Sequence, residues 1–239
     1  EIKNGFGENV IGLLEGKSKK DEYIIFGAHM DHLGKAANNY VYYGADDNGS
    51  GTALIMELAR VLSKHKDLKR NVLFIGFGAE EQGLIGSNYF VNYPTVSKEK
   101  IAMLFNFDMV GVGDGSIGIS GVETLRKYWE EFYNTLSSED KSKIRTGRTG
   151  IGGTDHTGFK LGGIPALSSA SNGMHKFYHV PDDTYDYVDP KVFHSVGGIV
   201  EKFALFIINY EGNIIHKHRN EKNFIDGCHT TDLNTGADI

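Results

Sequence analysis

The chain has 239 residues, 40% of them hydrophobic, which is enough to build the core of one large domain or of two small ones. Its net charge of −6 comes without a basic block, which argues against nucleic acid as a partner. No apolar run approaches the ~18 residues of a membrane helix, so we expect no membrane span.

The pattern of apolar residues predicts strands that alternate with helices along the chain. Expected strands are 9–15, 23–28, 71–78, 101–108, 116–120 and 164–169, and expected helices are 52–64, 87–92, 122–136 and 190–210. The glycine-rich segment 145–153 and the polar segment 177–184 are predicted to be loops. This alternation predicts an α/β fold, a three-layer α/β/α sandwich around a largely parallel, mixed central sheet.

We expect a single domain over residues 1–239, because no linker, repeat or low-complexity segment interrupts the pattern. The chain opens without an initiator Met or a signal peptide, so we expect a trimmed or mature form. Its single cysteine, Cys228, rules out an internal disulfide. The tail 212–239 is polar and contains His216, His218 and His229. It stays unassigned, and a solvated terminus explains it more simply than a second metal site.

Ionisable residues follow three of the predicted strands. His29 and Asp31 come at the end of the first of these strands, Glu80 and Glu81 follow the second, and Asp108 ends the third. In a parallel sheet, functional groups gather beyond the carboxyl ends of the strands. Taken singly, each of these three groups has a purely structural explanation. His29 and Asp31 could simply contact each other, Glu80 and Glu81 could be solvated, and Asp108 could cap a turn.

Taken together, these residues predict a metal site. Carboxylates gathered at one edge of a sheet repel one another and resist burial unless a cation neutralises them. Mixed imidazole and carboxylate ligands suit zinc, and bridging carboxylates suit a pair of metals. Asp31 has the place of a carboxylate that holds the second ring nitrogen of a histidine ligand, His29.

Five motifs resemble a known family. They are Gly27-Ala-His-Met-Asp31, Gly44-Ala-Asp-Asp-Asn-Gly-Ser-Gly51, Gly78-Ala-Glu-Glu-Gln-Gly-Leu-Ile-Gly-Ser87, Asn106-Phe-Asp-Met-Val-Gly111 and Tyr178-His179. In this order, over roughly residues 9–210, they resemble the co-catalytic zinc aminopeptidases of the bacterial leucyl aminopeptidase type. Relatives of that family include aminopeptidase Y, glutamate carboxypeptidase II and the glutaminyl cyclases. The resemblance implies a zinc exopeptidase-like fold.

The resemblance also implies a ligand set for two zinc ions, although other divalent metals fit the same residues. The implied metal ligands are His29, Asp47, Glu81, Asp108 and His179. Asp47 would bridge the two ions, because the bridging position falls three residues before Ser50; Asp46 would then be a neighbour. In family members the peptide bond after the bridging aspartate is often cis, so the resemblance implies a cis bond between Asp47 and Asn48.

Three further residues receive catalytic roles from the resemblance. Glu80 would be the general base, Asp31 the partner of His29, and Tyr178 a donor to the oxyanion, although plain packing remains an alternative for Tyr178. Asp182 and Asp183 are expected to brace the loop that carries His179. Asp155 and His156 could face the substrate or form a loop hydrogen bond.

The expected function is that of a metal-dependent aminopeptidase whose partner is a peptide with a free N-terminus. A single-zinc glutaminyl cyclase and a carboxypeptidase-type hydrolase are alternatives, the latter because Arg145, Arg148 and Lys160 lie in segments near the substrate side. A non-catalytic binding module is a third alternative. The family is mostly exported, which predicts a periplasmic or secreted protein. Side-chain preference and oligomeric state are open.

Overall fold

The computed structural model describes residues 5–37, 39–147 and 153–215. The strands are β1 (Val10–Leu14), β2 (Lys19–His29), β3 (Gly34–Lys35), β4 (Val41–Tyr42), β5 (Arg70–Phe77), β6 (Ile101–Phe107), β7 (Ile117–Ser120), β8 (Ile144–Thr146) and β9 (Ala166–Ser171). The helices are α1 (Gly51–Leu62), α2 (Ile85–Asn92), α3 (Arg126–Thr135), α4 (Ser138–Ser142), α5 (His156–Leu161) and α6 (Pro190–Asn209).

Within the described ranges, seven strands form one sheet in the order β1-β5-β2-β6-β9-β7-β8. The central strands β5, β2, β6 and β9 are all parallel, whereas β1 and β7 run antiparallel to their neighbours β5 and β9. The predicted largely parallel, mixed sheet is therefore confirmed. The parallel core matters for function because it brings the carboxyl ends of β2, β5 and β6 to the same edge.

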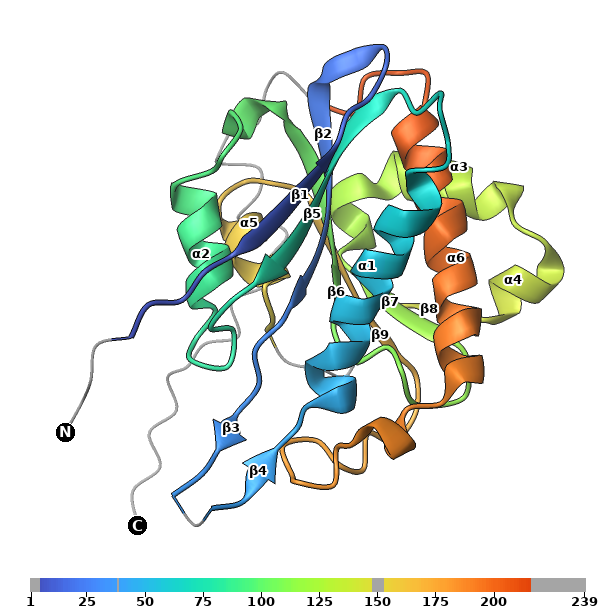
Figure 1. Ribbon diagram of the computed structural model, residues 1–239. Helices are drawn as coiled ribbons and strands as arrows, with labels where there is room; N and C mark the ends of the chain where they lie inside the picture. Colours follow the sequence, from blue (N-terminus) through green and yellow to red (C-terminus); the bar gives the residue numbers. More distant parts are fainter. Residues whose placement is uncertain (1–4, 38, 148–152, 216–239) are drawn as a thin grey trace, which may run out of the picture.

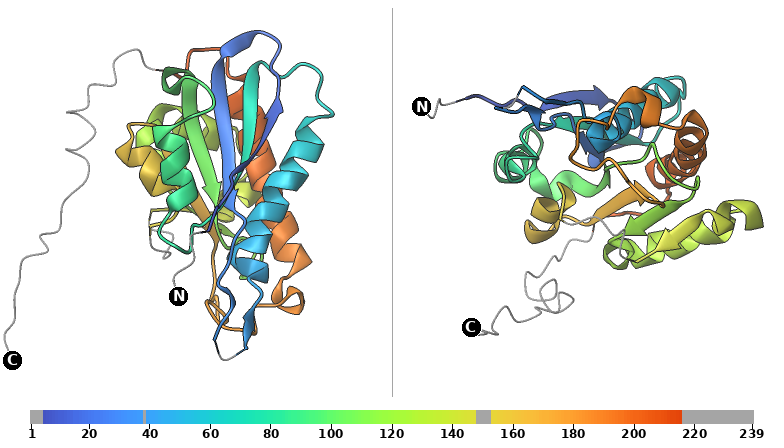
Figure 2. Two further views of the ribbon diagram at one scale, coloured as in Figure 1. Left: turned by 60° about the vertical axis from the view of Figure 1, so that its left-hand side comes forward. Right: turned by 90° about the horizontal axis from the view of Figure 1, so that it is seen from below.

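Both faces of the sheet are buried, as expected for parallel strands covered by helices. Along β2, Ile24 and Phe26 belong to a cluster with α1, α3 and α6, while Ile25 belongs to a cluster with α2 and α5. This alternation is the two-residue period of a strand that packs on both sides. Figures 1 and 2 show α1 and α6 on one face of the sheet and α2 and α5 on the other, so the three-layer architecture is confirmed.

Several predicted boundaries need correction. The helix predicted over 122–136 begins as a 3₁₀ turn, Val122–Leu125, and becomes α-helical only at Arg126. Part of the predicted glycine-rich loop is strand β8, and the segment that begins at His156 is helix α5 rather than a loop. The hairpin of β3 and β4 and the helix α4 were not predicted either. All these elements have two to six residues, which is too short to show a hydrophobic period.

The prediction that no apolar run is long enough to span a membrane also needs correction. In the part of the chain that the structure describes, the length and composition of α6 would allow it to cross a membrane, and its mean hydropathy is 1.4. Its residues Val196, Val200 and Phe203 are buried against the sheet. A helix in the core of a globular domain has the same composition, and that is the place of α6 here.

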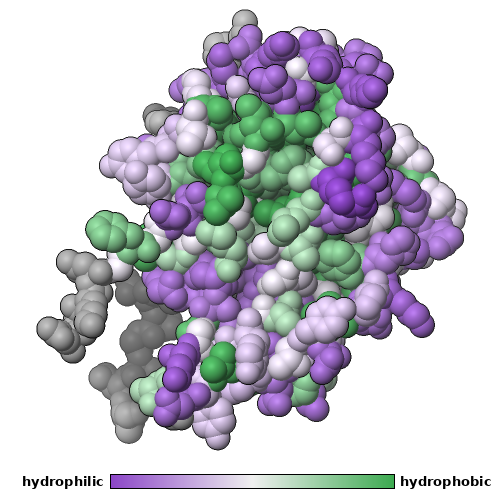
Figure 3. All heavy atoms as spheres, in the orientation of Figure 1, coloured by the Kyte–Doolittle hydropathy of each residue, from purple (hydrophilic) through white to green (hydrophobic). Residues whose placement is uncertain are grey.

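The edge strand β1 leaves apolar side chains on the surface. Val10 and Leu13 are more than half exposed. Figure 3 shows apolar residues gathered on this face of the molecule, over β1 and its neighbours. The carboxyl edge of the sheet lies elsewhere, beside the hairpin of β3 and β4 that projects from the domain (Figure 1).

Arg70, at the start of β5, fixes the end of α6 against the sheet. Its side chain is completely buried, and Nε lies 2.7 Å from the Glu22 carboxylate. The guanidinium also donates to the main-chain carbonyls of Ile207, Ile208, Tyr210 and Gly212. The last carbonyls of a helix have no partner within the helix and carry a partial negative charge, which a cation compensates.

We predict that Arg70→Met destabilises the fold strongly, because it leaves the Glu22 carboxylate and several carbonyls without their buried partner. The free energy of unfolding should fall by about 3–5 kcal/mol. Arg60→Met is the matched control: Arg60 pairs with Glu57 on the exposed face of α1, and such exposed pairs contribute little to stability. Denaturant unfolding of both variants measures the difference. If both variants lose the same free energy of unfolding, Arg70 does not have the stabilising role assigned to it here.

Candidate metal centre

The ionisable residues predicted from the sequence come together at the carboxyl edge of the sheet. His29 is the last residue of β2, Asp108 follows β6, and Glu80 and Glu81 lie just beyond the end of β5. Asp47 lies in the turn Ala45–Ser50, which leads into α1. The parallel order β5-β2-β6 is what makes these sequence-distant residues neighbours.

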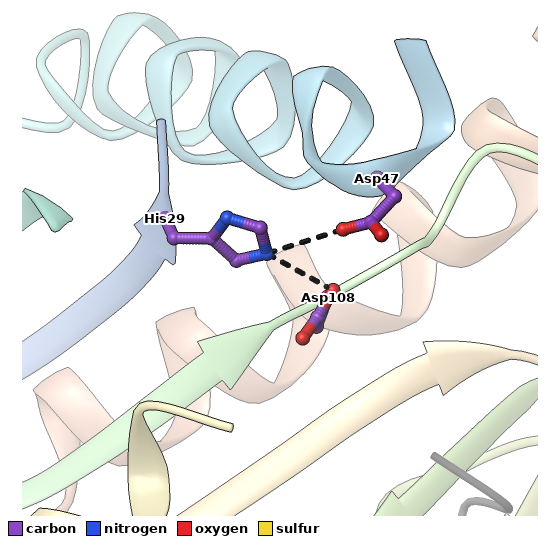
Figure 4. A group of neighbouring side chains, drawn as sticks. All are labelled: His29, Asp47 and Asp108. Carbon is purple, nitrogen blue, oxygen red and sulfur yellow. Dashed lines mark ion pairs between the residues drawn. The ribbon is translucent and has the colours of Figure 1, made fainter. Parts of the chain in front are cut away.

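The first group consists of His29, Asp47 and Asp108, all of them buried. Nε2 of His29 lies 3.3 Å from Oδ1 of Asp47 and 3.4 Å from Oδ1 of Asp108. Figure 4 shows both carboxylates pointing toward the same ring nitrogen. Metal–ligand bonds of ~2.0–2.2 Å place the ligands of a tetrahedral zinc ion about 3.3–3.6 Å apart. The observed separations match that spacing.

The second group consists of His179, Asp47 and Glu81. Nε2 of His179 lies 3.2 Å from Oδ2 of Asp47 and 3.2 Å from Oε2 of Glu81. Asp47 is thus shared: Oδ1 faces His29 and Oδ2 faces His179. One carboxylate with its two oxygens directed at two different imidazoles is the arrangement of a bridging ligand.

The turn that carries Asp47 is held by bonds to its backbone. The Asp183 carboxylate accepts the backbone N–H groups of Asp46 and Asp47, at 2.8 and 3.0 Å. The bond between Asp47 and Asn48 is cis, which agrees with the expectation. The Asn48 side chain donates to the Phe107 carbonyl and accepts from Gly51, so it ties this turn to the end of β6. Asp183 therefore braces the turn of Asp47, not only its own loop.

Asp46 is directed away from the two histidines. Its carboxylate accepts the Gly111 backbone N–H at 2.9 Å and lies 2.7 Å from Nδ1 of His175. The other ring nitrogen of His175 lies 3.0 Å from the Ser171 carbonyl. Burial lowers the pKa of His175, but the contact with Asp46 raises it above its ordinary value overall.

Asp31 makes different contacts from the expected ones. Nδ1 of His29 lies 3.0 Å from the main-chain oxygen of Asp31, while the Asp31 carboxylate is 3.8 Å away. That carboxylate instead accepts the backbone N–H groups of Glu80 and Glu81, at 3.0 and 3.2 Å. Asp31 thus orients His29 through its backbone and fixes the Glu80–Glu81 loop through its side chain.

Glu80 and Tyr178 line the small cavity at this centre, which has a volume of about 70 Å³ and is also lined by Thr154 and Met109. The pKa of Glu80 is raised to about 7, mainly by burial and further by neighbouring carboxylates. The charge of His29 acts in the opposite direction and lowers this pKa. Tyr178 is half exposed and stacks on His179. Burial raises the pKa of its phenol to about 12, so the hydroxyl keeps its proton at neutral pH.

The residues Asp155 and His156 lie behind this cavity, at the start of α5. Asp155 is completely buried, and burial raises the pKa of its carboxyl to about 7. Burial also lowers the pKa of His156 to about 4. Of the cations considered for a carboxylate-binding role, Lys160 pairs with Glu123 at 3.1 Å and Arg145 donates to main-chain carbonyls. Arg148 and the tail histidines lie outside the described residues.

The donor set fits a divalent cation. Burial alone lowers the pKa of His29, yet the carboxylates of Asp108 and Asp47 raise it to about 12. Among the described side chains, Oδ2 of Asp47 and Oε1 of Glu81 are buried without a hydrogen-bond partner. Buried carboxylates that favour a charged imidazole also favour a divalent cation, and zinc-class ions fit this donor set. All five predicted ligands lie in these two groups.

Two residues at the centre, His32 and His175, escaped the sequence analysis, and Asp183 was expected to brace a different loop. His32 lies 2.8 Å from Glu81, His175 pairs with Asp46, and Asp183 holds the backbone of the Asp47 turn. His32 could have been noticed from its position directly after the His-Met-Asp motif. No sequence signal connects His175 with Asp46, which lies 129 positions earlier in the chain.

Comparisons with known proteins give a consistent result. The profile of Peptidase family M28 matches residues 9–204. Aminopeptidase YwaD of Bacillus subtilis (strain 168) is 29% identical over 217 residues, which cover 82% of this chain and 44% of that protein. The solved structure of the aminopeptidase from Aneurinibacillus sp. strain AM-1 is 30% identical with a TM-score of 0.68, over 82% of this chain and 47% of that one.

A glutaminyl cyclase structure from Porphyromonas gingivalis shares the fold, with 21% identity and a TM-score of 0.67 over 83% of this chain and 77% of that one. The chain spans about half the length of the curated aminopeptidases it matches. The matched profile covers most of the chain, including every residue of the two imidazole–carboxylate groups, and the chain therefore belongs to Peptidase family M28.

Proposed function

We propose that this chain is the catalytic part of a metal-dependent aminopeptidase, which hydrolyses the first peptide bond of a substrate with a free N-terminus. The observation that carries the proposal is the shared carboxylate of Asp47, whose two oxygens face His29 and His179 at 3.3 and 3.2 Å. The aminopeptidases among its relatives support the same activity. A periplasmic or secreted location stays a prediction from family resemblance.

In this proposal, two zinc-class ions would be held by separate ligand pairs, with Asp47 as a ligand of both. His29 and Asp108 would hold one ion, and Glu81 and His179 would hold the other. A bound pair of such ions polarises a carbonyl and lowers the pKa of water enough to supply hydroxide at neutral pH. The spacing of the ligand atoms and the unpartnered Oδ2 of Asp47 support this assignment.

Glu80 moves the proton. Its carboxylate accepts a proton from the attacking water and returns it to the leaving amine, as general acid–base catalysis requires. The pKa of about 7 suits both steps, because a group that titrates near the operating pH gains and loses a proton readily. The bonds from Asp31 to the loop backbone keep the Glu80 carboxylate in place.

Tyr178 stabilises the negative charge that develops on the carbonyl oxygen. A phenol with a pKa of about 12 remains a hydrogen-bond donor at neutral pH. Stacking on His179 fixes the ring at the rim of the cavity. The acidic surroundings favour the ammonium group of a free N-terminus, and the engaged Lys160 and Arg145 argue against recognition of a free carboxylate.

The experiment that tests the function is hydrolysis of a panel of dipeptide amides by the intact chain. We expect release of the N-terminal amino acid, loss of release with a chelator, and recovery when zinc is added. Peptides with an acetylated N-terminus should not be hydrolysed. Cleavage of the last residue from such blocked peptides would indicate a carboxypeptidase. Ammonia release from N-terminal glutamine would indicate a cyclase, and no turnover at all would leave a binding module.

We predict that Glu80→Gln lowers kcat by about 10²–10⁴-fold while metal content is unchanged. The amide has nearly the same shape as the carboxylate but cannot accept the proton of water. Elemental analysis and initial rates, measured on the same sample, check both parts. Glu130→Gln, the same change on the exposed face of α3, is the control and should leave the rate near normal. Normal turnover in Glu80→Gln would place the base elsewhere.

Asp47→Asn and Asp46→Asn form a matched pair of adjacent substitutions. An asparagine offers only one oxygen, so Asp47→Asn should weaken both metal sites together. Asp46→Asn removes the charge that pairs with His175 and should lower the melting temperature, with metal content near two ions per chain. Zinc titration and thermal melting distinguish them. If Asp46→Asn loses metal and Asp47→Asn retains two ions, Asp46 rather than Asp47 is the bridging ligand.

A further inference from the structure

His32 lies beside the His179 end of the metal centre, and no role has been assigned to it so far. Its side chain is only 7% exposed. The ring meets that of His179 edge to face, with centroids 5.7 Å apart. Among the described side chains, both of its ring nitrogens are buried without a hydrogen bond of good geometry. A buried imidazole without such bonds is costly, so its placement needs an explanation.

His32 lies with Asp47 and Glu81 in a group that could itself hold a metal ion, so the distances around its Nδ1 are compared with those of a metal ligand. This atom lies 2.8 Å from Oε1 of Glu81 and 3.9 Å from Oδ2 of Asp47. The ligands of one tetrahedral zinc ion should lie about 3.3–3.6 Å apart. The first separation is shorter than that edge and the second is longer. A separation of 2.8 Å is, however, usual for a direct contact between an imidazole and a carboxylate, here an ion pair without the angle of a hydrogen bond.

The two oxygens of Glu81 therefore have different neighbours. Oε2 lies 3.2 Å from His179, with the spacing of a shared metal, whereas Oε1 faces His32. Oε1 is buried and has no hydrogen-bond partner among the described residues, so its 2.8 Å contact with His32 is an ion pair. A donor at Oε1 restricts the rotation of the carboxylate and leaves Oε2 for the metal. Groups that orient metal ligands in this way typically change metal affinity by 10–100-fold.

The backbone makes room for the His32 ring at Gly44. This residue has φ +65°, and a side-chain carbon there would lie 2.4 Å from Cγ and 2.6 Å from Cβ of His32. Only glycine fits such a close approach. The turn that carries Asp47 thus begins with a residue that accommodates the imidazole.

We propose that His32 is a positioning residue for the second metal: its Nδ1 pairs with Oε1 of Glu81 and directs Oε2 toward the ion shared with Asp47 and His179. The proposal rests on the two-metal centre proposed above. In this proposal, His32 orients the ligand Glu81 just as the main-chain oxygen of Asp31 orients the ligand His29.

The test is zinc binding to the metal-free chain, followed by calorimetry, for His32→Leu and His32→Asn. Leucine removes the donor, so the affinity of one of the two sites should fall by about 10–100-fold while the other is unchanged. The side-chain amide of asparagine has an N–H close to the place of Nδ1–H, so His32→Asn should recover much of that loss. His65→Leu, at an exposed histidine after α1, is the control and should bind like the wild type.

Each other outcome overturns the proposal. Unchanged affinities in His32→Leu would leave the residue without influence on the metal. Equal losses in the Leu and Asn variants, with an altered visible spectrum of the cobalt-substituted chain, would make His32 a direct ligand. If His32→Leu weakens both zinc sites and also lowers the melting temperature of the metal-free chain in chelator, the role of His32 is structural.

The same titration separates this proposal from the proposed function. If the wild-type chain binds two ions and hydrolyses no amide, the aminopeptidase activity fails and the His32 result still stands. If the wild-type chain binds a single ion, the two-metal centre itself fails.

Discussion

The mutual repulsion of buried carboxylates is the constraint on which this structure depends. Asp47, Glu81 and Asp108 end up within one small volume, each of them buried or nearly so. Without positive charge such a group opposes folding, because each carboxylate loses hydration and faces its neighbours. The imidazoles of His29 and His179 are placed between the acids, and the very high pKa of His29 shows how strongly the cluster favours a cation.

A second set of acids acts on the backbone instead of on the metal. Asp183 accepts two consecutive N–H groups at the Asp47 turn, and Asp31 accepts two at the Glu80–Glu81 loop. These bonds hold two loops that have no strand or helix of their own at the critical residues. Hydrogen bonds that fix a loop in this way reduce the cost of ordering the side chains it carries when a ligand binds.

The fold alone does not decide the chemistry. A glutaminyl cyclase has the same architecture at 21% identity, and the aminopeptidases have it too. The chemistry is set locally: within this chain, Oδ1 of Asp47 faces His29 and Oδ2 faces His179. Function in this family is therefore argued from the donor atoms around one shared carboxylate.

The sequence by itself determined the central strands, the helices α1 and α6, and the residues that meet at the carboxyl edge. Long apolar runs such as 23–28 have one stable place, a strand covered on both faces, and parallel pairing then brings their ends together. The choice of Asp47 over Asp46 came from the family resemblance, aligned on Ser50, and the structure directs these two side chains to different partners. Short elements such as α5 and β8 gave no readable period.

Only the tertiary structure decided which atoms meet. Asp31 contacts His29 through its main-chain oxygen and not through its carboxylate, and His175 reaches Asp46 across 129 positions. The orientation of His32 toward Oε1 of Glu81 depends on the left-handed backbone at Gly44. A hydrophobic period fixes which residues face the core, but a hydrogen bond depends on side-chain rotamers and on loop backbones, which take their shape only when distant segments pack together.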